Sequence, residues 1–209
     1  MSGAPSAPIG STHALLDRFP VGAPPVSEAG AAVTIVLRDG LRGPEVLLIE
    51  RTVSPTDPAS GQVGLPGGRV DAVDASLAAT AVRELGEEVG LLASDLEGPL
   101  RFVRTELAAR FSLRVAIFAA ALDPVGRPPA VASPREVAHV FWLRAPALAE
   151  TRRVFTETVR GRAEVPAAVV DGHIVWGFTR RILRDFFELP SEADEGGPIF
   201  AAGRSTAGD

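Results

Sequence analysis

The chain has 209 residues, of which 46% are hydrophobic and 22% charged, and this composition fits one domain with enough chain to bury a core. It contains no cysteine, which excludes disulfides, zinc–thiolate sites and a thiol nucleophile. A net charge of −5 argues against non-specific nucleic-acid binding, and no apolar run reaches the roughly 20 residues that span a membrane. We therefore expect a cytoplasmic protein with no nucleic-acid or membrane partner.

The beginning of the chain predicts an N-terminal segment followed by a β-hairpin. Residues 1–28 are expected to form a separate segment with one short helix near residues 12–19. The runs 31–38 and 45–51 are β-branched or rich in leucine and are separated by turn residues, so they predict two paired strands. The loop 52–62 that follows has too much proline and glycine for regular structure.

The acidic stretch 67–91 comes next, and the rest of the domain is organised around it. Asp74 is expected to cap a helix over residues 75–89, and Gly90 is expected to end that helix. On such a helix a group of glutamates lies on one face, and an apolar stripe suited to packing on a sheet lies on another. The glutamates are Glu84, Glu87 and Glu88, and the stripe is Ala78, Val82, Leu85 and Val89.

A cluster of glutamates on a helix is in most proteins a solvated face. That interpretation is less favoured here, because like charges four residues apart cost a few tenths of a kcal/mol, and Gly86 inside the helix costs about 1 kcal/mol relative to alanine. A hard cation turns this repulsion into ligation, since Mg²⁺ is usually held by one or two carboxylates together with water and substrate phosphates. The turn at residues 65–68 places a backbone carbonyl nearby as another oxygen ligand.

This stretch resembles the signature of the Nudix hydrolases, a box written G-x5-E-x7-R-E-U-x-E-E-x-G-U, where U is aliphatic. Residues 83–91 match its second half at every fixed position. In the first half Asp74 replaces the usual glutamate, and eight residues rather than seven separate it from Arg83. A box with this aspartate and one added residue is similar to that of the coenzyme A pyrophosphatase branch.

Two further stretches resemble the same branch. Residues 174–183 are similar to its terminal helix, which tends to read IWGxTxxIL. Upstream of the box the branch carries a second signature, and Arg51 and residues 65–68 match parts of it. The second arginine of that signature is absent, because Thr56 or Asp57 stands in its place. Arg51 is therefore either a phosphate or substrate contact or a surface arginine at the end of a strand.

Three more strands are expected after the box, at residues 100–107, 111–122 and 136–143. Glu136 begins the last of them, and the resemblance implies that it can supply an additional metal ligand. A structural salt bridge or an exposed strand end is the alternative for this residue. His139 lies within the same strand and is interpreted as a structural histidine rather than a base.

The C-terminal part predicts a short helix at 145–151, a hairpin with strands at 154–159 and 164–169, and a helix entered at Trp176. Residues 190–209 have the composition of a disordered tail. The apolar face of the last helix consists of Ile182, Leu183, Phe186 and Phe187.

The order of these elements and the resemblance together imply an α/β fold, a Nudix-type α/β/α sandwich with a mixed β-sheet, over residues 29–189. The resemblance also implies Mg²⁺ or Mn²⁺ as the cofactor, with Arg83 orienting the metal ligands by pairing with a box carboxylate such as Asp74. Arg69, beside the box, is the nearest candidate for reading a 3′-phosphate. The implied metal ligands are Glu84, Glu87, Glu88 and the carbonyl of Gly68, and Glu84 is a candidate base.

Three functions are compatible with these residues. The leading one is hydrolysis of coenzyme A or acyl-coenzyme A to adenosine 3′,5′-bisphosphate and a 4′-phosphopantetheine. The second is hydrolysis of another nucleoside diphosphate derivative such as ADP-ribose, which the missing upstream arginine favours. The third, a non-catalytic ligand-binding regulator with a Nudix fold, is disfavoured by the intact second half of the box. Each implies a small nucleotide as the partner, and both a monomer and a homodimer stay open.

Overall fold

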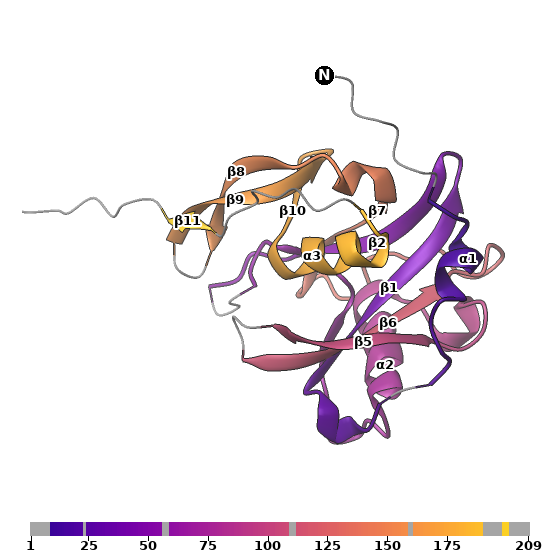
Figure 1. The fold of residues 1–209 in the computed structure, drawn as a ribbon. Helices are drawn as coiled ribbons and strands as arrows, with labels where there is room; N and C mark the ends of the chain where they lie inside the picture. The colour runs from indigo at the N-terminus through magenta and orange to yellow at the C-terminus, as the bar shows by residue number, and fades with distance from the viewer. Residues whose placement is uncertain are drawn as a thin grey trace, which may run out of the picture.

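The computed structural model describes residues 9–22, 24–55, 59–108, 112–158, 161–189 and 198–200. These residues form two β-sheets with the helix α3 (Gly177–Phe186) between them (Figure 1). The helix α2 (Leu77–Val89) covers the opposite face of the larger sheet (Figure 1). The expected α/β/α sandwich is confirmed. The smaller sheet beyond α3 was not predicted as a sheet.

The larger sheet has seven strands, and their mixed orientation was expected. Its order is β3-β2-β1-β6-β5, with β4 also paired to β1 and β7 to β2. Strands β1 and β6 are parallel, whereas the other pairs are antiparallel. Every strand expected for this sheet is present, and the short strands β3 and β4 are additional. The bounds are β1 Ala31–Gly40, β2 Gly43–Arg51, β3 Val63–Gly64, β4 Gly67–Arg69, β5 Arg101–Ala108, β6 Leu113–Ala121 and β7 Val137–Arg144.

Both faces of the larger sheet are buried, which the alternation along β1 explains. Ile35 and Leu37 face the core under α3, whereas Val36 faces the core under α2, and all three are 0% exposed. Successive side chains on a strand point to opposite faces, so one apolar run supplies two cores. Leu183 of α3 fills the first core and Leu85 of α2 the second. The C-terminal helix is thus part of the same packed unit as the box helix.

The helix α2 begins two residues later than expected, and the predicted cap was wrong. Ser76, not Asp74, is the N-cap, and its hydroxyl accepts a hydrogen bond from the Ala79 N–H at 3.1 Å. Gly90 ends the helix in the left-handed conformation, with φ of 72°, as expected. The buried apolar positions are Leu77, Ala81, Leu85 and Val89, whereas the predicted Ala78 and Val82 are only half-buried.

The N-terminal segment is tied to the larger sheet by the short helix α1 (Thr12–Leu16). Its first residue donates to Asp39 Oδ1 of β1 twice, from the backbone N–H at 3.0 Å and from the hydroxyl at 2.7 Å. These two bonds hold the pKa of the Asp39 carboxyl below its usual value. Short 3₁₀ helices connect other elements: η1 Val26–Glu28, η2 Ala93–Asp95 and η4 Ala145–Leu148, the last lying where a short helix was expected.

The smaller sheet has four strands, with β9 at its centre. The predicted hairpin forms its first two strands, and β10 and β11 were not predicted. The expected disorder of residues 190–209 falls mostly outside the described residues, but two residues of that stretch pair with β9 at Glu164 and Ala163. In the described part of the chain, no helix is both long and apolar enough to cross a membrane. The bounds are β8 Arg152–Thr158, β9 Gly161–Val170, β10 His173–Trp176 and β11 Ile199–Phe200.

Candidate functional site

The candidate site forms where β4 lies between the start of β1 and the C-terminal half of α2. Two glycines allow this close approach. Gly67 has φ of 150°, and a Cβ atom there would lie 2.3 Å from the Ala32 carbonyl oxygen. A Cβ on Gly68 would lie 2.3 Å from Glu84 Oε1. The backbone of Gly68, one of the predicted ligands, is therefore in direct contact with a predicted ligand of the helix.

Arg83 lies at the centre of the polar contacts. Its Nε and Nη2 donate to the two carboxylate oxygens of Asp74, each at 3.0 Å. Its Nη1 donates to Glu84 Oε1 at 2.9 Å and to Glu87 Oε2 at 2.8 Å. Its Nη2 also donates to the Arg69 carbonyl at 2.9 Å, which ties the helix to β4. The two bonds to Asp74 are the pairing of Arg83 with a box carboxylate that was expected.

Asp74 is a buried partner of Arg83 rather than a helix cap. Its side chain is 3% exposed, and Thr80 Oγ1 also donates to it at 2.9 Å. The Arg83 guanidinium holds the pKa of the Asp74 carboxyl well below its usual range. This supporting role of Thr80 was not predicted from the sequence. The signal for it is the spacing, because Thr80 follows Asp74 by six residues and lies in the first turns of α2.

Glu88 is the most deeply buried of the three glutamates, with a side chain that is 1% exposed. It accepts a hydrogen bond from the Gly67 N–H at 2.8 Å and contacts Arg51 Nη1 at 3.4 Å. Burial raises the pKa of Glu88 to about 7, and the negative charges of Glu84 and Glu136 act in the same direction. Like the Thr80–Asp74 bond, the bond from the Gly67 N–H to Glu88 was not predicted from the sequence.

Burial also raises the pKa of Glu84, whose side chain is 11% exposed. The charges of Glu87 and Glu136 add to this shift. Glu136 is exposed and directly precedes Val137 of β7, which pairs with Arg51 of β2. Glu87 differs from the other two, because its side chain is 55% exposed and lies at the rim. The predicted single glutamate face is thus divided into two buried carboxylates and one exposed carboxylate.

The remaining predicted residues lie at the edge of this cluster. The Arg51 side chain, 28% exposed, reaches Glu88 from the end of β2. Arg69 contributes its carbonyl to Arg83, and its side chain is exposed. His139 is exposed and contacts the ring of His173 edge-on at 6.0 Å, away from the box carboxylates. Thr56 and Asp57, which replace the missing arginine, lie outside the described residues.

The donor set of the cluster fits a hard divalent cation. Among the residues that the structure describes, no three acidic or histidine side chains already converge as a metal-binding group. The carboxylate of Glu84 is bound by Arg83, and that of Glu88 by the Gly67 N–H. All available donors are oxygens, however, and burial raises the pKa of both glutamates, so a nearby cation would favour their ionised form. To bind these carboxylates, a cation would compete with Arg83 for Glu84 and with the Gly67 N–H for Glu88.

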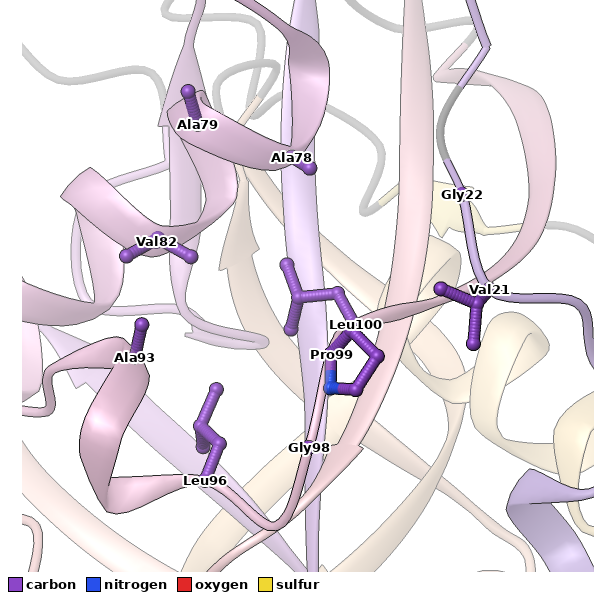
Figure 2. A pocket seen from close by; sticks show the side chains of 10 residues that line it. All are labelled: Val21, Gly22, Ala78, Ala79, Val82, Ala93, Leu96, Gly98, Pro99 and Leu100. Carbon is purple, nitrogen blue, oxygen red and sulfur yellow. The ribbon is translucent and has the colours of Figure 1, made fainter.

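An apolar hollow between α2 and residues 93–100 is separate from this cluster. It has a volume of about 470 Å³, and Figure 2 shows Ala78 and Val82 of the helix facing it with Leu96 and Leu100. None of its lining residues is charged. A diphosphate needs cationic partners, so this hollow does not fit one.

The depressed pKa of Asp74 predicts an acid-dependent loss of stability. Because the folded pKa lies below the unfolded value of about 3.9, the Asp74 contribution is present above that pH and is lost as the pH falls toward the folded pKa. Asp74→Asn should therefore lower the free energy of unfolding by about 2 kcal/mol at pH 7, with a smaller difference at pH 3. Urea denaturation at both pH values measures this.

The matched control is Asp71→Asn, which removes a charge from an exposed position in the same turn. It should change the free energy of unfolding by less than about 0.5 kcal/mol. Equal stability of wild type and Asp74→Asn at pH 7 would contradict the structural role assigned to the buried pair.

Comparison with known proteins identifies the family. The family model described as NUDIX domain matches residues 28–160, which is more than half of the chain. The human protein described as mitochondrial coenzyme A diphosphatase NUDT8 is 32% identical over 167 residues, covering 77% of this chain and 69% of that protein. The uncharacterized Nudix hydrolase NudL of Salmonella paratyphi B is 34% identical over 147 residues, covering 68% of this chain and 73% of that protein.

Solved structures of the same family are also similar. A MutT NUDIX hydrolase from Burkholderia pseudomallei is 24% identical, with a TM-score of 0.42, over 56% of this chain and 84% of that one. The NUDIX domain of Shewanella oneidensis NrtR, solved with ADP ribose, is 21% identical, with a TM-score of 0.42, over 56% of this chain and 72% of that one. By the match to the family model and the identity to these relatives, this chain belongs to the Nudix family and is a pyrophosphohydrolase.

Proposed function

We propose that the protein hydrolyses coenzyme A or acyl-coenzyme A, giving adenosine 3′,5′-bisphosphate and a 4′-phosphopantetheine or its acyl derivative. The observation that carries the proposal is the bidentate Asp74–Arg83 pair, at 3.0 Å for both bonds. This aspartate and the added residue before Arg83 are the features that resemble the coenzyme A branch. The similarity to a relative described as a coenzyme A diphosphatase supports the same substrate.

Nudix hydrolases generally use divalent metal ions, and we propose Mg²⁺ or Mn²⁺ for this one. The buried carboxylates of Glu84 and Glu88, the rim carboxylate of Glu87 and the Gly68 carbonyl would hold the ions, with Glu136 as a further ligand. When bound, such ions neutralise the phosphate oxygens and lower the pKa of the attacking water. Their positive charge would also favour the ionised form of the two buried glutamates, whose pKa values burial raises.

The protein side chains supply orientation and proton transfer. Arg83 fixes the Glu84 and Glu87 carboxylates by donating to both from Nη1. The Gly67 N–H fixes the orientation of Glu88. Glu84 is the proposed acceptor of the water proton, because a carboxylate with a raised pKa holds a proton more readily than an ordinary one.

Two arginines are proposed to bind the substrate. Arg51 lies beside Glu88, next to the cluster, and is proposed to contact the diphosphate. Arg69 presents an exposed guanidinium from β4 and is proposed to bind the 3′-phosphate, since arginine binds phosphate oxygens bidentately. The absence of the upstream arginine, with Thr56 or Asp57 in its place, favours ADP-ribose or a related diphosphate as the alternative substrate.

Glu88→Gln should abolish turnover and preserve the fold. The amide keeps the shape of the side chain, and its oxygen still accepts from the Gly67 N–H, but the negative charge for a metal ion is lost. We expect turnover to fall by about 100-fold or more with little change in melting temperature. Glu150→Gln, at an exposed position just before β8, is the matched control and should leave turnover unchanged. A Glu88→Gln rate within about tenfold of wild type would contradict the metal assignment.

The substrate proposal predicts an order of cleavage rates. With Mg²⁺ or Mn²⁺, coenzyme A should be cleaved at least about tenfold more efficiently than dephospho-coenzyme A or ADP-ribose, because only coenzyme A carries the 3′-phosphate. Chromatography of the products measures kcat/KM for each compound. Equal or better cleavage of ADP-ribose would contradict the coenzyme A proposal and favour the alternative, with the metal site unaffected.

A further inference from the structure

Strand β8 (Arg152–Thr158) has one edge that pairs with no strand in the part of the chain that the structure describes. Its other edge pairs with β9 along all seven residues. It lies at the top of the view in Figure 1, above α3 and the larger sheet. An open edge presents backbone N–H and C=O groups that can pair with another strand. Phe155, at the middle of β8, is 54% exposed.

The sequence of β8 is complementary to itself when two copies run antiparallel. A two-fold axis through Phe155 gives the register that pairs all seven residues of the strand. In this register Arg153 of each copy lies opposite Glu157 of the other, on both sides of the axis. The two Phe155 side chains lie opposite each other at the centre. Opposite charges and aromatic pairs at directly opposed positions stabilise antiparallel strands.

The three residues that carry this complementarity share one face of the sheet. Arg153, Phe155 and Glu157 alternate along the strand, so their side chains point the same way. The guanidinium of Arg162 on β9 lies 5.0 Å from the Phe155 ring centroid, and Arg153 lies 3.7 Å from Glu164. On this face the Phe155 ring is therefore surrounded by both positive and negative side chains. A second copy adds a carboxylate to each Arg153.

The neighbouring two-fold registers are less favourable. Moving the axis to Val154 places Arg153 opposite Phe155, and moving it to Thr156 places Phe155 opposite Glu157. Each choice removes the Phe155–Phe155 pair and both Arg153–Glu157 pairs, and leaves part of β8 without a partner residue. The charge pattern therefore selects the register centred on Phe155.

We propose that two copies of this chain associate through β8 and join their smaller sheets into one continuous sheet. This pairing makes the protein a homodimer, and it uses no residue of the candidate catalytic cluster. The strand that the two copies share lies outside the box helix and β4. Loss of hydrolysis in Glu88→Gln therefore neither supports nor contradicts the dimer.

A single cysteine tests the pairing directly, because the chain contains none. Directly opposed residues in antiparallel strands have Cα atoms about 4.5–5.5 Å apart, which is within the range that a disulfide spans. Phe155→Cys should form a disulfide-linked dimer under mild oxidation in dilute solution. Leu41→Cys is the control, since Leu41 is fully exposed in the turn between β1 and β2 and should form dimers only by random collision. Equal rates for the two variants would overturn the proposal.

Charge reversal tests the register. Glu157→Arg places two arginines opposite each other on both sides of the axis, and should raise the dimer Kd about tenfold. Adding Arg153→Glu restores opposite charges in the reversed order and should return the Kd to near the wild-type value. Sedimentation over a dilution series measures the Kd, and circular dichroism checks that each variant is folded. A wild-type protein that stays monomeric, or a double variant no tighter than Glu157→Arg, would overturn the proposal.

Discussion

The guanidinium of Arg83 is the interaction on which the rest of the site depends. It donates to Asp74, Glu84 and Glu87 and to the Arg69 carbonyl, so one side chain joins β4, the turn before α2 and two successive turns of the helix. Without it these carboxylates would repel each other across a few ångströms. A lysine has one charged group with three donors and cannot replace the planar fork that binds Asp74 from one side and the glutamates from another.

A steric constraint accompanies this electrostatic one. Gly67 and Gly68 bring the β4 backbone against β1 on one side and against Glu84 on the other, where any Cβ atom would overlap its neighbours. The Gly67 N–H is then free to bind Glu88 in a site that water barely reaches. The result is a helix face with two buried carboxylates whose pKa values are raised and whose charge a divalent cation would offset.

The sequence predicted the sandwich and the place of the box, because apolar periodicity and the spacing of the glutamates are local properties. It did not identify the cap of α2, since Asp74 and Ser76 are both good caps and a contact with Arg83 nine residues away decides between them. It also placed Glu87 with its two neighbours. The sheet packs against one side of the helix only, and that side buries Glu84 and Glu88 and leaves Glu87 exposed.

The smaller sheet was predicted only in part. Its first hairpin was predicted. Strand β10 was missed although it pairs with β9 locally, across the Asp171-Gly172 turn, whereas β11 pairs with β9 from a distant part of the chain. Strand pairing between distant segments leaves little trace in local residue patterns. The same sheet carries the edge strand β8, so the part of the fold that was hardest to predict is also the part that carries the proposed dimer contact.

Calorimetric titration with Mn²⁺ in the absence of substrate tests the central claim most directly, namely that the buried carboxylates under Arg83 form a cation site. Wild type should bind Mn²⁺, and Glu88→Gln should bind it at least about tenfold more weakly, because a charged ligand has been replaced by a neutral one of the same shape. Glu150→Gln should bind as wild type does. Equal Mn²⁺ affinity for wild type and Glu88→Gln would contradict the account.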